Sequence, residues 1–274
     1  MIPEHVWFRG LPEGGAKVER LSLGFDRLPE GLSGLRILFV SDVHAGYTFP
    51  EAAQRRLIDQ IEGISPDVIL WGGDFAETKE DARRLFGQIA RLKPRLGMAG
   101  VAGNNDRRAF RGSMDDFRQL AERAGIKILI NERRTIPAPS GELTILGLDE
   151  DFYGSPDPSI LGEKGREAGI SILLSHSPAP LEQLLNGRTP PDLILCGHTH
   201  GGQVRAGGLT LYSLGYEGVR SRQRFFTVRG LVREGGSMLV VSGGLGSSKF
   251  PLRINCPPEM QLITLLRDVQ APSF

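Results

Sequence analysis

The 274-residue sequence has few cysteines and no long apolar run, and each shortage excludes some classes of protein. Its two cysteines, Cys196 and Cys256, are too few for a disulfide framework, which indicates a reducing compartment. No stretch is long and apolar enough for a signal peptide or a membrane span, so we expect a cytoplasmic location. Any membrane contact would then be peripheral, through surface patches.

The chain also carries little net charge. Its formal net charge of +1 at pH 7 provides no overall attraction for nucleic acid or for an acidic partner. The 36 glycines and 18 prolines exceed ordinary usage and indicate many tight loops rather than long helices. Because we find no internal repeat, low-complexity tract or linker, we predict that residues 1–274 form a single domain.

Short apolar runs alternate with amphipathic segments through most of the chain. The predicted strands cover residues 35–40, 67–71, 96–102, 143–148, 170–174 and 193–195. The predicted helices cover residues 51–61, 79–92 and about 114–124, the last with Ser113 as its cap and Gly125 as its stop. Later apolar runs, at residues 209–212, 225–228, 238–241 and 260–266, have no helices between them. This predicts a second, more antiparallel sheet packed on the first.

Only five histidines are present, yet four of them lie in short motifs that follow these apolar runs. The motifs are Ser41-Asp42-Val43-His44, Gly72-Gly73-Asp74, Gly103-Asn104-Asn105-Asp106, Ser175-His176-Ser177-Pro178 and Gly197-His198-Thr199-His200-Gly201-Gly202. In open α/β sheets, ligands bind beyond the carboxyl ends of the strands. We therefore expect one sheet edge to gather these side chains.

Each motif taken singly has a simpler explanation. Asp42-Val43-His44 could be a surface turn, Gly72-Gly73-Asp74 is typical of a turn, and His176 could satisfy a backbone carbonyl. His198 and His200 are more informative, because residues two apart on an extended segment share a face. Together, the carboxylate, amide and imidazole groups suit a hard or borderline divalent metal, and about seven such side chains would serve two adjacent metals.

In this order the motifs resemble those of the calcineurin-like metallophosphoesterase superfamily. The resemblance is strongest to a bacterial branch of small phosphoesterases with a Gly-His-Thr-His-Gly-Gly-Gln motif, here residues 197–203. Residues 242–246, 251–253 and 257–259 are also similar to that branch, so the resemblance covers roughly residues 35–266. It implies a four-layer α/β/β/α sandwich of two packed mixed β-sheets flanked by helices, together with a dinuclear metal site.

The resemblance also implies a set of metal ligands. It assigns Asp42, His44 and His200 to the first metal, Asn104, His176 and His198 to the second, and Asp74 to a bridging position. Such a bridge holds two cations roughly 3.5–4 Å apart and makes a water between them acidic enough to attack phosphorus as hydroxide. The mixed ligand set fits Mn²⁺, Fe or Zn²⁺ better than Ca²⁺, and the family favours Mn²⁺.

One position departs from the family pattern. Members usually read Gly-Asn-His-Asp/Glu, with a histidine that protonates the leaving oxygen, where this chain has Asn105. Asn105 can donate a hydrogen bond but no proton at neutral pH, and general acid catalysis contributes about 10²–10⁴-fold. Asn105 and Asp106 are our catalytic candidates, with Arg107 and Arg108 nearby.

Two hypotheses follow from this departure. The protein could be an active enzyme whose leaving group needs little protonation, such as a phosphoanhydride or an aryl phosphate. Alternatively, it could be a catalytically weakened metal-binding paralogue that acts as a scaffold. We favour the enzyme, because a scaffold would have no reason to keep all the metal-ligand positions.

A basic and aromatic segment suggests the substrate. Arg220, Arg222 and Arg224 lie among Tyr212, Tyr216, Phe225 and Phe226, either on a solvated surface or on a lip over the metals. Arginines suit phosphate, and aromatic faces suit acyl chains or bases. Because some members of the branch cleave acylated nucleotide-sugar precursors, we expect a small phosphate ester or a lipid-linked substrate. A nuclease of the same fold is the competing class, although the charge disfavours nucleic acid; no protein partner is evident.

Overall fold

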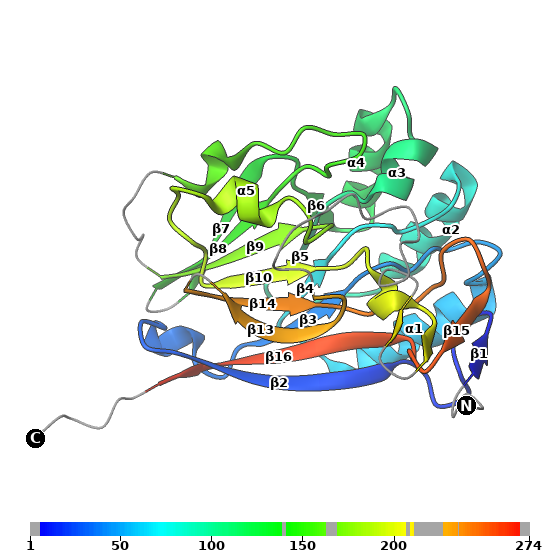
Figure 1. Cartoon of the computed structure of the whole chain (residues 1–274), viewed down its shortest axis with the longest axis horizontal. Coiled ribbons are helices and arrows are strands. Elements are labelled where there is room, and N and C mark those ends of the chain that lie inside the picture. The colour runs from blue at the N-terminus through cyan, green and yellow to red at the C-terminus, as the bar shows by residue number, and fades with distance from the viewer. Residues whose placement is uncertain are drawn as a thin grey trace, which may run out of the picture.

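The computed structural model describes residues 6–138, 141–162, 169–206, 209–210, 227–234 and 236–268. Within these residues, two six-stranded mixed sheets pack face to face and carry helices on their outer faces (Figure 1). This is the four-layer α/β/β/α arrangement that the family resemblance implied.

The first sheet contains the strands that lead to the early motifs. Its order is β2 (Lys17–Phe25), β16 (Glu259–Arg267), β3 (Arg36–Val40), β4 (Val68–Trp71), β5 (Met98–Gly100) and β6 (Ile126–Ile128). Strands β3 to β6 run parallel, whereas β16 is antiparallel to β3 and parallel to β2. The parallel strands therefore end at one edge of this sheet.

The second sheet contains the strands that lead to the later histidines. Its order is β13 (Gly230–Glu234), β14 (Ser237–Val241), β10 (Leu193–Cys196), β9 (Ile170–Ser175), β8 (Gly141–Gly147) and β7 (Glu132–Ala138). Strands β8, β9, β10 and β14 are parallel, and the two edge strands, β7 and β13, are antiparallel to their neighbours. Two small ribbons pair β1 (Val6–Phe8) with β15 (Leu252–Ile254), and β11 (Arg205–Ala206) with β12 (Leu209–Thr210).

Helices cover the outer faces. The α-helices are α1 (Glu51–Ile64), α2 (Lys79–Ile89), α3 (Asn104–Ala109), α4 (Met114–Arg123) and α5 (Leu181–Leu185). The 3₁₀ helices are η1 (Glu30–Leu32), η2 (Pro158–Leu161) and η3 (His200–Gly202). Helices α1, α2 and α4 pack on the first sheet, while α5 and η2 pack on the second. No helix among the described residues is long and apolar enough to cross a membrane.

The core explains why the strands read as unbroken apolar runs. In β3, Ile37 and Phe39 face the second sheet, whereas Leu38 and Val40 pack under the helices. All four side chains are fully buried. Because both faces of a parallel sheet are covered, its strands need apolar residues at every position rather than at alternate ones.

Most predicted elements are confirmed, but the prediction that the runs after His200 form the second, more antiparallel sheet is wrong. Strand β14 extends the parallel part of the second sheet, and β16 enters the first sheet between β2 and β3. Part of the predicted strands at 209–212 and 225–228 lies outside the described residues. Both cysteines, Cys196 and Cys256, are buried and free.

Two predicted details of α4 had different outcomes. Ser113 precedes the helix, but its side chain makes no cap; its hydroxyl donates to the Phe110 carbonyl at 3.2 Å. Gly125 follows the helix with a φ of +85°, a left-handed conformation that ends a helix and that glycine adopts most easily.

Candidate metal centre

The candidate ligands follow strands from both sheets. Asp42 and His44 come after β3, Asp74 after β4 and Asn104 after β5. The remaining three are His176, after β9, and His198 and His200, after β10. Because the two sheets pack face to face with these strand ends at one end of the sandwich, the fold brings all seven side chains together.

Four of these side chains form a first group of possible ligand atoms. His44 Nε2 lies 3.3 Å from Asp74 Oδ2 and 3.0 Å from His200 Nε2. His200 Nε2 in turn lies 3.6 Å from Asp42 Oδ1. Ligand atoms of Asp42, His44 and His200 fall within 4.8 Å of one another, which is close enough to bind one metal ion.

A second group shares Asp74 with the first. Asp74 Oδ1 lies 3.6 Å from His176 Nε2, which is 3.1 Å from Asn104 Oδ1. His198 Nδ1 lies 3.0 Å from the same Asn104 oxygen and 3.3 Å from His176 Nε2. The two oxygens of Asp74 thus face different groups.

In two of the imidazoles, a contact made by Nδ1 leaves Nε2 as the nitrogen that faces the cluster. His44 Nδ1 lies 2.5 Å from Glu77 Oε1, and His176 Nδ1 lies 2.7 Å from the Gly72 carbonyl. Since a carboxylate and a carbonyl only accept hydrogen bonds, each Nδ1 carries the proton. Nε2 of each ring then faces the cluster and is the nitrogen that would bind a metal once it carries no proton.

The charges of the cluster also favour a cation. Burial lowers the pKa of His176, but the carboxylates of Asp74 and Asp42 raise it to about 9. Burial and the neighbouring His176 lower the pKa of His198 to about 3. One imidazole is thus protonated to balance the buried carboxylates while its neighbour stays neutral. Divalent cations would supply that positive charge instead, so the residues present fit a metal centre.

The backbone is strained at most of the candidate ligands. Five of them have φ between 48° and 68°, in the left-handed region that L-residues rarely adopt; they are Asp42, His44, Asp74, His198 and His200. Each such residue costs on the order of 1–3 kcal/mol and persists only where the surroundings hold it. Clustering of strain at one set of polar side chains is typical of a functional site.

Glycines at the strand ends make this convergence possible. A Cβ atom on Gly103 would lie 2.1 Å from Asp74 Oδ1, and one on Gly197 would lie 1.9 Å from Ser41 Oγ. Neither position can hold a side chain without displacing the loop that carries a candidate ligand. The glycines of these motifs are therefore required for close packing of the loops.

The loop after β14 supports the first group from behind. Gly246 N donates to the Asp42 carbonyl at 2.7 Å. Arg253, whose exposed fraction is 1%, donates to the Gly243 carbonyl at 2.8 Å, and its Nη2 lies 3.1 Å from His200 Nδ1. Arg253 thus connects this loop to the imidazole of His200.

Asn105 and Asp106 both lie at the cluster but make different contacts. Asn105 donates to Asp74 through its backbone N–H at 2.8 Å and through Nδ2 at 2.5 Å. Asp106 accepts from the backbone N–H groups of Asp74 at 2.8 Å, Phe75 at 2.9 Å and Gly103 at 2.9 Å. Burial and the nearby Asp74 carboxylate raise the pKa of Asp106 to about 7.

Sequence reasoning missed Glu77 and gave no role to Arg253 in the resembling segment 251–253. No local signal identifies Glu77, because only folding brings it to His44. The predicted substrate-binding residues Arg220, Arg222 and Arg224 lie outside the described residues. Arg229, which follows them in the chain, forms a bidentate ion pair with the buried Glu259.

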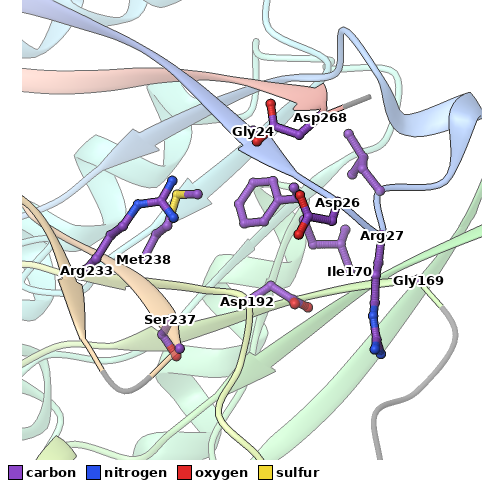
Figure 2. A pocket seen from close by; sticks show the side chains of 13 residues that line it. Gly24, Asp26, Arg27, Gly169, Ile170, Asp192, Arg233, Ser237, Met238 and Asp268 are labelled. Atoms are coloured by element: carbon purple, nitrogen blue, oxygen red, sulfur yellow. The ribbon is translucent and has the colours of Figure 1, made fainter. Parts of the chain in front are cut away.

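A cavity of about 380 Å³ lies at the end of the sandwich opposite to the candidate ligands. Figure 2 shows the side chains that line it. It is lined by the starts of β9 and β10, at Ile170 and Asp192, and by the ends of β2 and β16. Strand β9 separates it from His176 by its six residues, or about 20 Å. Asp192 there accepts hydrogen bonds from the backbone and hydroxyl of Ser171, so this carboxylate is engaged within the fold.

Several known proteins are similar in sequence to this chain. Phosphodiesterase YaeI from Escherichia coli is 27% identical over 233 residues, covering 84% of this chain and 82% of that protein. UDP-2,3-diacylglucosamine pyrophosphatase LpxG from Chlamydia trachomatis is 25% identical over 314 residues, covering 95% and 92%. A transmembrane protein with metallophosphoesterase domain from Danio rerio is 28% identical over 260 residues; the match covers 91% of this chain but only 57% of that relative.

The family model of the calcineurin-like phosphoesterases matches residues 35–202, which is more than half of the chain. The matched region contains all seven candidate ligands. The chain therefore belongs to the calcineurin-like phosphoesterase family and is a metal-dependent phosphoric ester hydrolase.

Proposed function

We propose that the protein hydrolyses a phosphodiester or pyrophosphate bond with a pair of divalent cations. The observation that carries this proposal is the position of Asp74, whose two oxygens face two separate groups of nitrogen and oxygen atoms. Asp42, His44 and His200 would hold one cation, and Asn104, His176 and His198 the other. When bound, the pair would lower the pKa of a water nucleophile and neutralise charge on the phosphoryl oxygens.

The metal that we propose is Mn²⁺, with Fe or Zn²⁺ as alternatives. The donor set combines carboxylate and amide oxygens with imidazole nitrogens, and it contains no thiolate. Imidazoles favour a transition metal, whereas Ca²⁺ binds oxygen ligands almost exclusively.

Asn105 would act on the substrate by hydrogen bonding rather than by proton transfer. The residue is 6% exposed and its side-chain amide donates to Asp74, so it lies where a phosphoryl oxygen would approach the carboxylate that we propose bridges the cations. We assign Asp106 a positioning role, because three backbone N–H groups occupy its carboxylate. The reaction would then favour a leaving group that departs without a proton, such as a phosphoanhydride or an aryl phosphate.

The substrate class that we favour is a nucleotide-sugar or lipid-linked phosphate. LpxG, which aligns over nearly the whole chain, is a UDP-2,3-diacylglucosamine pyrophosphatase. The chain enters and leaves the Arg220–Arg222–Arg224 segment beside the histidine loop: a Cβ on Gly202 would contact Thr210, and Thr199 Oγ1 donates to the Val228 carbonyl at 2.6 Å. These contacts support a role for the three arginines in binding substrate phosphate.

The test is hydrolysis of bis-p-nitrophenyl phosphate, UDP-2,3-diacylglucosamine and single-stranded DNA by the Mn²⁺-loaded protein. We expect turnover of the first two and none of the DNA; preferential cleavage of DNA would indicate a nuclease instead. The matched control is Asp74→Asn, which removes the bridging charge at nearly constant volume and should lower kcat/KM by about 10²-fold or more. Stoichiometric metal binding without hydrolysis of any substrate would favour the scaffold hypothesis.

A further inference from the structure

An aromatic side chain lies directly against one of the candidate ligands. The ring centroid of Phe152 is 5.4 Å from that of His198, with the planes inclined by 41°. The side chain is nevertheless 49% exposed. His198 and Asn104 are also the two candidate ligands that are only half-buried, so the cluster opens to solvent on this side. Phe152 therefore presents an open ring at the mouth of the second group.

Buried carboxylates hold the backbone of this loop. Glu150, which is 1% exposed, accepts from the backbone N–H groups of Phe152 at 2.8 Å and Tyr153 at 2.6 Å. Asp149 accepts from Ser155 N at 2.9 Å, and its own N–H donates to Asn131 Oδ1 at 2.9 Å. The backbone of residues 149–155 is thus held both by carboxylates within the loop and by Asn131.

An ion pair also connects this loop to the metal ligands. Arg107 binds Asp149 and lies on α3, the helix that begins at the candidate ligand Asn104. The exposed ring of Phe152 and the amide of Asn104 are therefore held by one connected set of contacts. The ring is thus held beside His198 through its backbone while its own surface stays open to solvent.

We propose that Phe152 stacks on a planar aromatic group, such as a nucleobase or an aryl ring, attached to the phosphate that occupies the metal centre. This inference rests on the proposed function. It adds a planar ring as the part of the substrate that the site would recognise beside the phosphate. Aromatic faces bind planar rings by offset stacking, and one such contact changes affinity by roughly fivefold to tenfold.

The experiment compares three ligands that share a phosphonate head group and differ in the organic group bonded to phosphorus. Binding of methylphosphonate, phenylphosphonate and cyclohexylphosphonate to the Mn²⁺-loaded protein is measured by calorimetry, so no turnover is needed. We expect phenylphosphonate to bind about fivefold to tenfold more tightly than the other two. Phe152→Ala should abolish this preference and Phe152→Trp should retain it. Tyr153→Ala, which removes the exposed neighbouring ring, is the matched control and should also retain it.

Each outcome separates this inference from the proposed function. Equal binding of phenyl and methyl compounds to the wild type, or an unchanged preference in Phe152→Ala, overturns the stacking role alone. Equal binding of the phenyl and cyclohexyl compounds overturns the proposal of a planar ring and indicates that the site accepts any apolar group of this size. A loss of Mn²⁺ affinity in Phe152→Ala would show that the ring only packs His198. If none of the phosphonates binds the metal-loaded wild type, the proposed phosphoesterase site itself fails.

Discussion

Glu77 Oε1 lies 2.5 Å from His44 Nδ1, on the side of the imidazole that faces away from Asp74 and His200. Its other oxygen accepts from Arg108 Nη2 at 3.0 Å. The carboxylate fixes the orientation and the tautomer of His44 and increases the basicity of the nitrogen that would bind a metal. Burial lowers the pKa of His44, but the hydrogen bond to Glu77 and the charge of Asp74 raise it overall.

The substitution Glu77→Gln should weaken metal binding at the first group. The amide keeps the shape of the side chain but loses the charge, and loss of such a supporting carboxylate typically costs about 10–100-fold in metal affinity or activity. Calorimetric titration with Mn²⁺ measures the change. The control is Glu80→Gln, which alters an exposed carboxylate paired with Arg83. Equal Mn²⁺ affinities of Glu77→Gln and the wild type would contradict a supporting role.

The substitution Asn105→His should supply the missing general acid. We expect it to raise kcat for an alkyl phosphodiester by about 10²-fold, with a much smaller gain for bis-p-nitrophenyl phosphate, whose leaving group departs without a proton. Steady-state kinetics with both esters measures the difference, and thermal unfolding shows whether the larger side chain is accommodated. Equal gains for both esters would indicate a change in binding rather than in proton transfer.

Metal removal should destabilise the fold, because only the folded chain brings the seven candidate ligands together. At a free Mn²⁺ concentration of about 100 times its dissociation constant, one bound ion adds about 2.7 kcal/mol to the free energy of unfolding. Urea unfolding with Mn²⁺ and with a chelator measures this gain. Asp74→Asn should show a smaller gain. Superimposable curves for the wild type under the two conditions would be inconsistent with a metal centre in the folded state.

Removal of Phe117 should destabilise the core under α2 and α4. Its ring is fully buried and lies 5.2 Å from that of Phe110 and 5.8 Å from those of Phe75 and Phe86. We expect Phe117→Ala to lower the free energy of unfolding by about 3–5 kcal/mol, measured by urea unfolding. Phe8→Ala removes a ring that is 67% exposed and should change it by only about 0.5 kcal/mol. Comparable losses in both variants would argue against this aromatic core.

Local sequence patterns predicted the strands best where both faces are buried. The runs that became β3, β4, β9 and β10 are predominantly apolar, and each ends at a polar motif. Strand β2 was not predicted, because its burial alternates irregularly and its sequence mixes charged and apolar residues. Its partner β16 was recognised as a strand but assigned to the wrong sheet, since the register between β16 and β2 joins residues more than 200 positions apart.

The sequence alone determined which short segments are buried and which polar side chains are candidates for binding a metal, because hydrophobic runs, turn glycines and ligand chemistry act within a few residues. Only the tertiary structure decided that β16 enters the first sheet, that Glu77 and Arg253 contact His44 and His200, and that Phe152 lies against His198. These contacts join residues far apart in the chain, and their free energy depends on how the two sheets pack. No local pattern records that packing.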